Sequence, residues 1–395
     1  MKKPELLAPA GDPERCRTAI LYGADAVYLG GRRFSLRSRA SNFTLQDIRE
    51  ACAFAREHSA AIHVTVNVIP HEQDFEGLED YLKELRDAGV QAVIVASPAI
   101  MALAKKTVPE LEVHCSTQLS ITNAAAADFL QKRAGIDRVV LARECSLDDV
   151  RRITASCSVD TEAFIHGGMC VNWSGRCTLS NRMTLRDANR GGCAQSCRWR
   201  YHLYRGEEDT GMMTMGSKDL CAVHEIADLM EAGVSSFKIE GRMKTEYYVA
   251  SIVSAYRHLI DEIAEKGRLS EERMRWHTEQ IMKGENREVC SGFYRGTAGR
   301  DSLILHPDQD DRLNHRFLGK VESVCSGRAV LVTRNPFSIG ERAEVMSPGM
   351  PVRSFIIEEM KDEEGNYLER SRTPMRRIEI PVPFEVQPGD MMRRE

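Results

Sequence analysis

Short apolar runs alternate along the first 245 residues with longer segments whose apolar residues recur at helical spacing. The runs are rich in Val, Ile and Leu and apolar almost throughout, as expected of strands covered on both faces. Between them, the segment 74–90 is typical of the predicted helices, with Gly89 as its C-terminal cap. The eight predicted strands are ELLAPAG, AVYLGG, IHVTVNV, AVIVASP, LEVHCST, RVVLARE, EAFIHGG and SSFKIEGR.

This repeated strand–helix order predicts an α/β fold, a TIM-type (β/α)8 barrel over residues 1–245. A doubly wound open sheet is the alternative architecture. It is disfavoured because no GxGxxG motif follows the first strand, where such a sheet would bind a dinucleotide.

The pattern changes after residue 245. Residues 246–300 predict a helical extension and linker, with helices at 246–267 and 270–283. Residues 317–395 are alternating and turn-rich, which predicts a small all-β barrel domain. Its basic stretch SRTPMRRIEI suggests either an RNA contact or a solvent-exposed edge strand whose charged side chains prevent pairing with another strand.

Composition narrows the class of protein. The opening residues MKKPELLAPAG lack a secretory apolar run, and no segment approaches the ~18 uncharged residues that a membrane span needs, so we expect a cytoplasmic protein without a membrane segment. Cytosolic thiols stay reduced, so some of the 12 cysteines should bind metal. A net charge of -4 argues against a generally basic nucleic-acid-binding surface but allows a local basic patch.

Four cysteines cluster after the seventh predicted strand, in CVNWSGRC and CAQSC: Cys170, Cys177, Cys193 and Cys197. They lie in the longest insertion, 170–221, on the face where barrels carry their chemistry, and metal ligation can order such a loop. The gaps of six, fifteen and three residues match neither the paired CxxC of structural zinc nor a CxxxCxxC run. Spacing therefore favours an iron–sulfur cluster over zinc or unliganded thiols, with Cys221 as a reserve ligand.

A peptidase is the competing class. His71 and His224 are each followed by Glu, but neither completes HExxH, and no GxSxG motif exists. A Cys170–His166 pair is conceivable, although residues four apart around a strand end seldom reach the geometry that activates a nucleophile.

The stretch EAFIHGGMCVNWSGRCTLSN resembles the signature of the collagenase-like U-32 peptidase family. The blocks APAG, GADAVYLGG, STQLSITN, GGCAQSCRWRY, SKDL, FKIEGRMK and GFYRG extend this resemblance along the whole barrel. Better understood members of that family hydroxylate tRNA, ribosomal RNA or ubiquinone and carry a 4Fe-4S cluster. The resemblance thus implies a 4Fe-4S cluster on Cys170, Cys177, Cys193 and Cys197, with zinc as the alternative.

A barrel with one compact C-terminal domain is most similar to the tRNA branch of that family. This similarity implies tRNA as partner, prephenate as co-substrate and 5-hydroxyuridine at the wobble position as product. The alternatives are a collagenase-like peptidase, hydroxylation of another RNA or of a quinone-type substrate, and a non-catalytic scaffold subunit. Because related hydroxylation factors work as pairs, a paralogous partner subunit is a second candidate partner beside tRNA.

Two arginines at strand ends are the candidates for binding an anionic co-substrate. Arg143 follows the sixth strand and Arg242 the eighth, and a dianionic carboxylate such as prephenate needs bidentate cations. Each arginine could instead form an ion pair with Glu144 or Glu240.

Three polar residues near strand ends, Asn67, Gln118 and Asn123, are candidates for hydrogen-bonding a base edge, or alternatively for capping loops. His166 and Glu240 are the candidate catalytic residues. A packing histidine is the alternative interpretation of His166.

Overall fold

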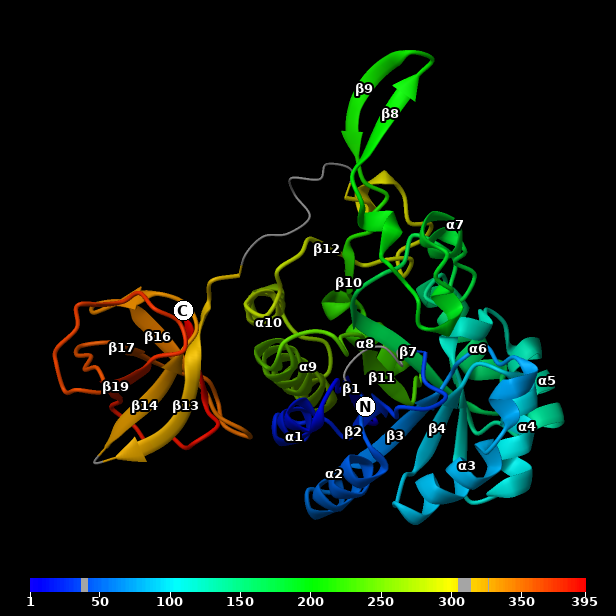
Figure 1. Ribbon diagram of the computed structural model, residues 1–395, viewed down its shortest axis with the longest axis horizontal. Helices are drawn as coiled ribbons and strands as arrows, with labels where there is room; N and C mark the ends of the chain where they lie inside the picture. The colour runs from blue at the N-terminus through cyan, green and yellow to red at the C-terminus, as the bar shows by residue number, and fades with distance from the viewer. Residues whose placement is uncertain (37–41, 305–313, 326) are drawn as a thin grey trace.

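The computed structural model describes residues 1–36, 42–304, 314–325 and 327–395, and its largest part is a closed parallel barrel (Figure 1). The strand order is β11-β1-β2-β3-β4-β5-β6-β7, and pairing of β11 with β7 closes the ring. All eight predicted strands are present, so the predicted TIM-type fold is confirmed. They are β1 (Glu5–Pro9), β2 (Ala26–Gly30), β3 (Ala61–Val66), β4 (Ala92–Val95), β5 (Glu112–Cys115), β6 (Arg138–Val140), β7 (Asp160–Gly167) and β11 (Ser236–Ile239).

Amphipathic helices cover the outside of the barrel. In α3, Leu78, Tyr81, Leu82 and Leu85 form the buried face at helical spacing. The helices are α1 (Pro13–Leu21), α2 (Leu45–Glu57), α3 (Leu78–Asp87), α4 (Pro98–Thr107), α5 (Ala124–Ala134), α6 (Leu147–Ser156), α8 (Ile226–Glu231), α9 (Glu246–Lys266) and α10 (Glu271–Met282). The sequence assigned α9 to a separate extension, yet its buried face belongs to the same core as the barrel.

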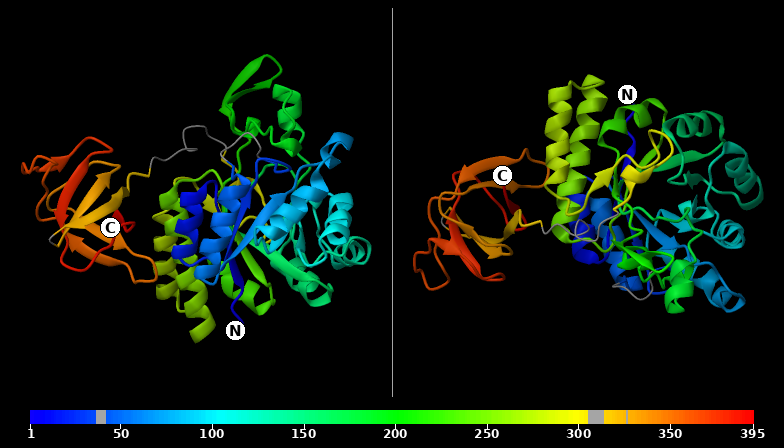
Figure 2. Two further views of the ribbon diagram at one scale, coloured as in Figure 1. Left: turned by 60° about the horizontal axis from the view of Figure 1, so that its bottom comes forward. Right: turned by 90° about the horizontal axis from the view of Figure 1, so that it is seen from above.

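The C-terminal segment forms the predicted small all-β domain, a curled antiparallel sheet with its own apolar core (Figure 2). Its strand order is β17-β16-β20-β13-β14-β19, and β15 pairs with β18. β19 is an edge strand. The strands are β13 (Phe317–Cys325), β14 (Arg328–Thr333), β15 (Phe337–Ser338), β16 (Arg342–Met346), β17 (Arg353–Ile356), β18 (Arg370–Ser371), β19 (Arg377–Pro381) and β20 (Met391–Arg394).

This β domain docks against the barrel beside α9 and α10 (Figures 1 and 2). Phe317 stacks on Tyr247 of α9 with ring centroids 4.6 Å apart. The Lys283 ammonium lies 2.6 Å from the Glu344 carboxylate. Met346 is part of the barrel's own apolar core, so the two domains share buried contacts.

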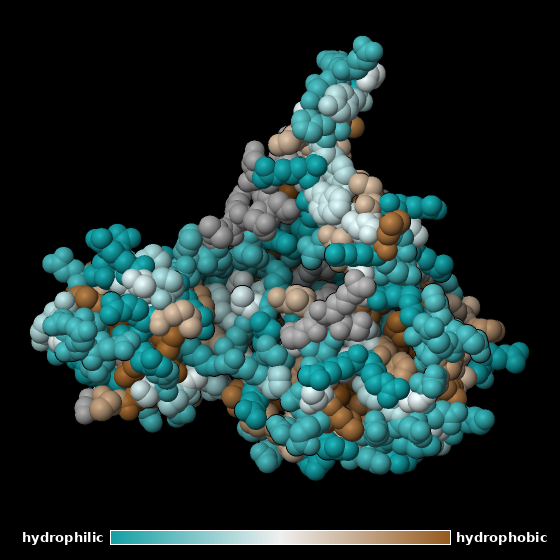
Figure 3. Space-filling view, viewed as in Figure 1, coloured by the Kyte–Doolittle hydropathy of each residue, from teal (hydrophilic) through white to brown (hydrophobic). Residues whose placement is uncertain are grey.

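The chain between β7 and β11 carries the largest insertion. We call residues 168–218 the Cys-rich loop; it contains the short helix α7 (Leu179–Thr184) and a hairpin of β8 (Tyr201–Arg205) and β9 (Glu208–Met213). After it, β10 (Asp219–Cys221) runs antiparallel to β7 and pairs with β12 (Val289–Cys290). The hairpin, which the sequence did not predict, stands clear of the molecule, with hydrophilic and apolar residues mixed around its base (Figure 3).

Candidate functional site

A cavity of about 200 Å³ lies at the carboxyl ends of the barrel strands. Five of the seven non-cysteine residues predicted from sequence line it, together with Cys170 of the Cys-rich loop. They are Asn67, Gln118, Arg143, Glu240 and Arg242. Most of the non-cysteine site residues that the sequence predicted from strand ends therefore line one cavity.

Lys238 lies deeper in the cavity and was missed from sequence. Its ammonium is 2.7 Å from a Glu162 oxygen and 4.6 Å from the Tyr28 ring centroid. Burial raises the pKa of Glu162, but Lys238 and Arg138 more than offset this, so the net shift is downward and the carboxylate stays ionised. The cavity thus has a charged floor.

At the cavity wall, the Arg143 guanidinium contacts an aromatic ring and a carboxylate, and its Nη1 donates to the Gly168 carbonyl. The guanidinium carbon lies 3.9 Å from the Phe164 ring centroid, and Nη2 is 3.5 Å from Glu240 Oε2. The ion pair that the sequence suggested as an alternative is therefore present. Both members of this ion pair line the cavity.

Arg242 is buried on the opposite wall, in a polar environment. It donates from Nη1 to the hydroxyls of Ser35 and Thr65, both at 3.4 Å, and from Nη2 to Asn42 at 3.0 Å. These hydrogen bonds to two hydroxyls and an amide oxygen hold the guanidinium group at the cavity lining, where it can face an anionic ligand.

The two predicted amides that line the cavity contact each other. Asn67 Nδ2 donates to Gln118 Oε1 at 2.9 Å, and Asn67 Oδ1 accepts from the Leu36 amide at 3.1 Å. Asn123, by contrast, lies outside the cavity lining and caps α5 by accepting from the Ala126 amide at 2.9 Å. The capping alternative describes Asn123.

His166 lies outside the cavity lining, although the neighbouring strand residue Phe164 belongs to it. The register of β7 against β11 shifts between Lys238 and Ile239, which pair with Phe164 and His166 respectively. This bulge turns His166 out of the period-2 alternation and behind the cavity wall.

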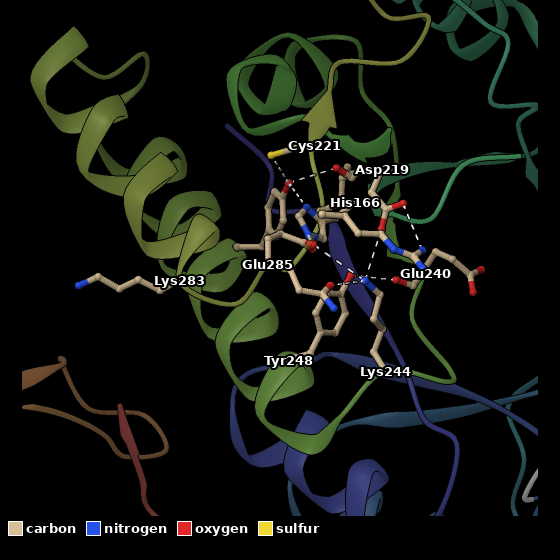
Figure 4. A network of polar contacts seen from close by, with 12 residues as sticks. His166, Asp219, Cys221, Glu240, Lys244, Tyr248, Lys283 and Glu285 are labelled. Carbon is tan, nitrogen blue, oxygen red and sulfur yellow. Dashed lines mark hydrogen bonds and ion pairs between the residues drawn. The ribbon is translucent and has the colours of Figure 1, made fainter. Parts of the chain in front are cut away.

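There His166 joins a buried polar network with Glu285, Lys244 and Asp219 (Figure 4). Its Nε2 lies 2.6 Å from Glu285 Oε1, and its Nδ1 lies 3.2 Å from the Tyr256 hydroxyl. Because that hydroxyl donates to the Ile165 carbonyl, both ring nitrogens can donate, as in an imidazolium. Burial lowers the pKa of His166, but Cys221 and Glu285 raise it, to about 9 overall.

Of the four predicted ligand cysteines, Cys170 lines the cavity, and the other three act electrostatically on it or on one another. Burial raises the pKa of the Cys170 thiol, the Arg143 guanidinium lowers it, and nearby Cys193 and Cys177 raise it further. The pKa of the Cys197 thiol is likewise raised by burial and by the other three thiols. Four thiols from one loop thus lie within electrostatic reach of one another.

Specific contacts tie this loop to the barrel. Ser174 donates from its amide and its hydroxyl to Glu144, both at 2.8 Å. Gly175 has φ +71°, and a Cβ there would lie 2.0 Å from the Gln118 carbonyl oxygen, so only glycine allows this approach. Arg198 Nη2 lies 3.3 Å from Asp219 Oδ1, beside Cys197.

The donor set fits a cluster on chemical grounds, since iron–sulfur clusters are held by four thiolates. In the part of the chain that is described, no three His, Cys, Asp or Glu side chains are arranged to hold a single metal ion.

Among those same residues, no helix combines the length and apolar character that crossing a membrane requires.

Comparison with known proteins identifies the family. Models of "Peptidase family U32" and "Peptidase family U32 C-terminal domain" match residues 11–303 and 313–393. The chain is 41% identical over 405 residues to tRNA hydroxylation protein P1 of Bacillus subtilis, covering 100% of this chain and 95% of that protein. It is 42% identical over 268 residues to a 23S rRNA 5-hydroxycytidine synthase of Escherichia coli, covering 66% of this chain and 40% of that protein. It is 32% identical over 412 residues to a collagenase of Porphyromonas gingivalis, covering 99% of this chain and 97% of that protein. The chain belongs to peptidase family U32.

Proposed function

We propose that this protein is an iron–sulfur enzyme that hydroxylates RNA, with the wobble uridine of tRNA as target and prephenate as co-substrate. The observation that carries the proposal is the meeting of two features in one barrel mouth. Cys170, from the four-thiol loop, lines the same cavity as Arg143, Lys238 and Arg242.

In this proposal Cys170, Cys177, Cys193 and Cys197 hold a 4Fe-4S cluster, which supplies one-electron transfer beside the substrate when bound. The cavity arginines bind the carboxylates of the co-substrate, since guanidinium groups match carboxylate geometry. Arg242 suits this role because it is buried, lines the cavity and is held in place by Ser35, Thr65 and Asn42.

Asn67 and Gln118 are the proposed contacts to the base edge. Their mutual hydrogen bond leaves the Asn67 amide one further donor hydrogen, enough to read a uracil oxygen. Glu240 is the proposed proton acceptor, since its carboxylate lines the cavity beside Arg143. A base in an anticodon loop is unpaired and costs little to extrude into such a cavity.

The names of two relatives support RNA as the substrate class, since one is a tRNA hydroxylation protein and the other an rRNA hydroxycytidine synthase. The collagenase relative favours a peptidase. However, the described lining of the cavity pairs no histidine with Cys170, Ser116 or Ser174, whereas a cysteine or serine peptidase needs that pairing.

The test is nucleoside analysis of total tRNA by mass spectrometry from a strain lacking this protein and any paralogue. We expect 5-hydroxyuridine and its further-modified forms to fall sharply and to return with the intact gene. Cys193→Ser should fail to restore them, whereas Cys325→Ser, a matched exposed thiol in the β domain, should succeed. Unchanged nucleosides in the deletion strain would reject the tRNA function.

A further inference from the structure

The Cys-rich loop concentrates positive charge on its outer side. Residues 170–206 hold seven arginines and one aspartate, although acidic residues (58) outnumber basic ones (54) in the whole chain. Four of these arginines are exposed and form no ion pair within the described residues: Arg176, Arg182, Arg186 and Arg205. Exposed guanidinium groups without acidic partners are suited to binding phosphate.

The same loop exposes aromatic rings. Two of the chain's three tryptophans lie here, and Trp173 and Trp199 are 52% and 41% exposed. Tyr204 of the hairpin is 58% exposed. Large exposed aromatic rings among arginines are typical of surfaces on which unpaired bases stack.

This surface is continuous with the cavity. Cys170, Asn172 and Ser174 line the cavity, whereas Trp173 between them and Arg176 beyond them are exposed. One short segment therefore contributes side chains to the cavity lining and, through Trp173 and Arg176, to the exposed surface beside it. A nucleotide held on the outer side would lie next to the cavity mouth.

We propose that this surface, the loop face formed by Trp173, Trp199 and the four arginines, docks the single-stranded loop of the RNA substrate. The arginines contact phosphates, the indoles stack on unpaired bases, and the target nucleotide is presented to the cavity. The inference rests on the proposed RNA hydroxylation. Unpaired bases are required because a duplex hides its base faces within the stack.

The first experiment measures RNA binding to the anaerobically purified full-length holoprotein by fluorescence anisotropy. The probes are an anticodon stem–loop RNA and a fully paired RNA duplex of equal length. Arg182→Glu/Arg186→Glu should weaken stem–loop binding at least tenfold, and the slope of log affinity against log salt should fall by about 1.4 because two phosphate contacts are lost. The control Arg49→Glu/Arg133→Glu makes the same charge change on exposed positions of α2 and α5 and should leave affinity within about twofold.

The second experiment isolates stacking. Trp173→Ala should weaken stem–loop binding about tenfold and leave duplex binding unchanged, because stacking acts only on unpaired bases. Trp173→Phe, which keeps a ring, should retain most of the affinity. Trp276→Ala removes the tryptophan of α10 and serves as the control. Equal losses on both RNAs, or equal losses in either control, would overturn the proposal.

Failure of this inference and failure of the proposed function are distinguishable. If tRNA nucleosides depend on the gene but the loop-face variants bind the stem–loop normally, the docking surface is wrong and the function stands. If the variants lose stem–loop binding but nucleosides do not depend on the gene, the docking surface stands and the function is wrong. Iron content equal to wild type in every variant ensures that binding reports the surface itself.

Discussion

The β domain and the Cys-rich loop are both joined to the same barrel, yet their interiors differ in kind. The β domain buries large apolar side chains in a core of its own, among them Leu318, Leu331 and Phe337. The residues of the Cys-rich loop that are buried are all small: Ser180, Ala188, Gly192, Ser196, Thr214, Gly216 and Ser217.

The difference matters because apolar burial stabilises by about 25 cal/mol per Å². The β domain obtains this contribution from its own sequence. The loop obtains little of it, so its order depends on hydrogen bonds such as Ser174 to Glu144 and, in our proposal, on bonds from thiolates to metal. The two regions should therefore respond oppositely to loss of metal and loss of apolar volume.

The largest expected effect is that of Cys193→Ser. The variant should lose essentially all bound iron, and trypsin should cleave the arginine-rich loop at least tenfold faster, because a missing ligand releases the chain it ordered. The β domain and barrel should stay protected. Iron analysis and timed proteolysis followed by mass spectrometry provide the measurement, with Cys325→Ser as control. Full iron content in Cys193→Ser would reject its role as a ligand.

Leu331→Ala should have the opposite effect to Cys193→Ser, because it should destabilise the β domain and leave the Cys-rich loop unchanged. Removing this fully buried side chain should cost the β domain about 2–5 kcal/mol in free energy of unfolding, measured by urea denaturation. Iron content and loop cleavage should match wild type. Loss of iron in this variant would show that the two regions are not independent.

The buried His166–Glu285 pair predicts a pH dependence of barrel stability. The folded pKa of His166, which burial lowers but Cys221 and Glu285 raise to about 9 overall, exceeds its unfolded value of about 6.5. The stability contributed by the protonated imidazole is therefore complete below pH ~6.5 and is lost as pH rises through ~9. The loss should amount to roughly 1–3 kcal/mol. Denaturation curves between pH 6 and 10 measure it, and Glu285→Gln should flatten the dependence. A wild-type stability that is constant across this range would contradict the protonated pair.

The smallest effect is expected for Arg377→Ala. Arg377 pairs with Glu322 at 2.8 Å on the exposed edge strand β19, and such surface pairs contribute little to stability. The melting temperature should not change measurably. A loss of stem–loop affinity as large as that of Arg182→Glu/Arg186→Glu would instead move the RNA contact to the β domain.

The sequence predicted the barrel because central parallel strands are apolar throughout. Five of its seven non-cysteine site residues line the cavity because functional side chains of a barrel lie at the strand ends. Lys238 was missed since its strand, SSFKIEGR, was treated as an apolar run. Alternation along the strand was the available signal, because Lys238, Glu240 and Arg242 lie two residues apart and all line the cavity.

Two features could not be read from apolar pattern. His166 leaves the cavity lining because of a bulge in β7, which depends on pairing with β11 rather than on local sequence. The hairpin of β8 and β9 has no buried face and hence no apolar alternation. The sequence feature that could have indicated this hairpin is Gly206. It has φ +63° and is the first residue of the two-residue turn between the paired residues Arg205 and Glu208.

The most direct test of the account is the metal content of the wild-type protein purified without oxygen. Iron, acid-labile sulfide and zinc should be quantified per chain, together with the visible absorption spectrum. We expect a brown protein with about four iron and four sulfide ions per chain, which bleaches when an iron chelator is added under reducing conditions. A colourless protein that holds one tightly bound zinc ion would contradict the account and restore the peptidase interpretation of this family member.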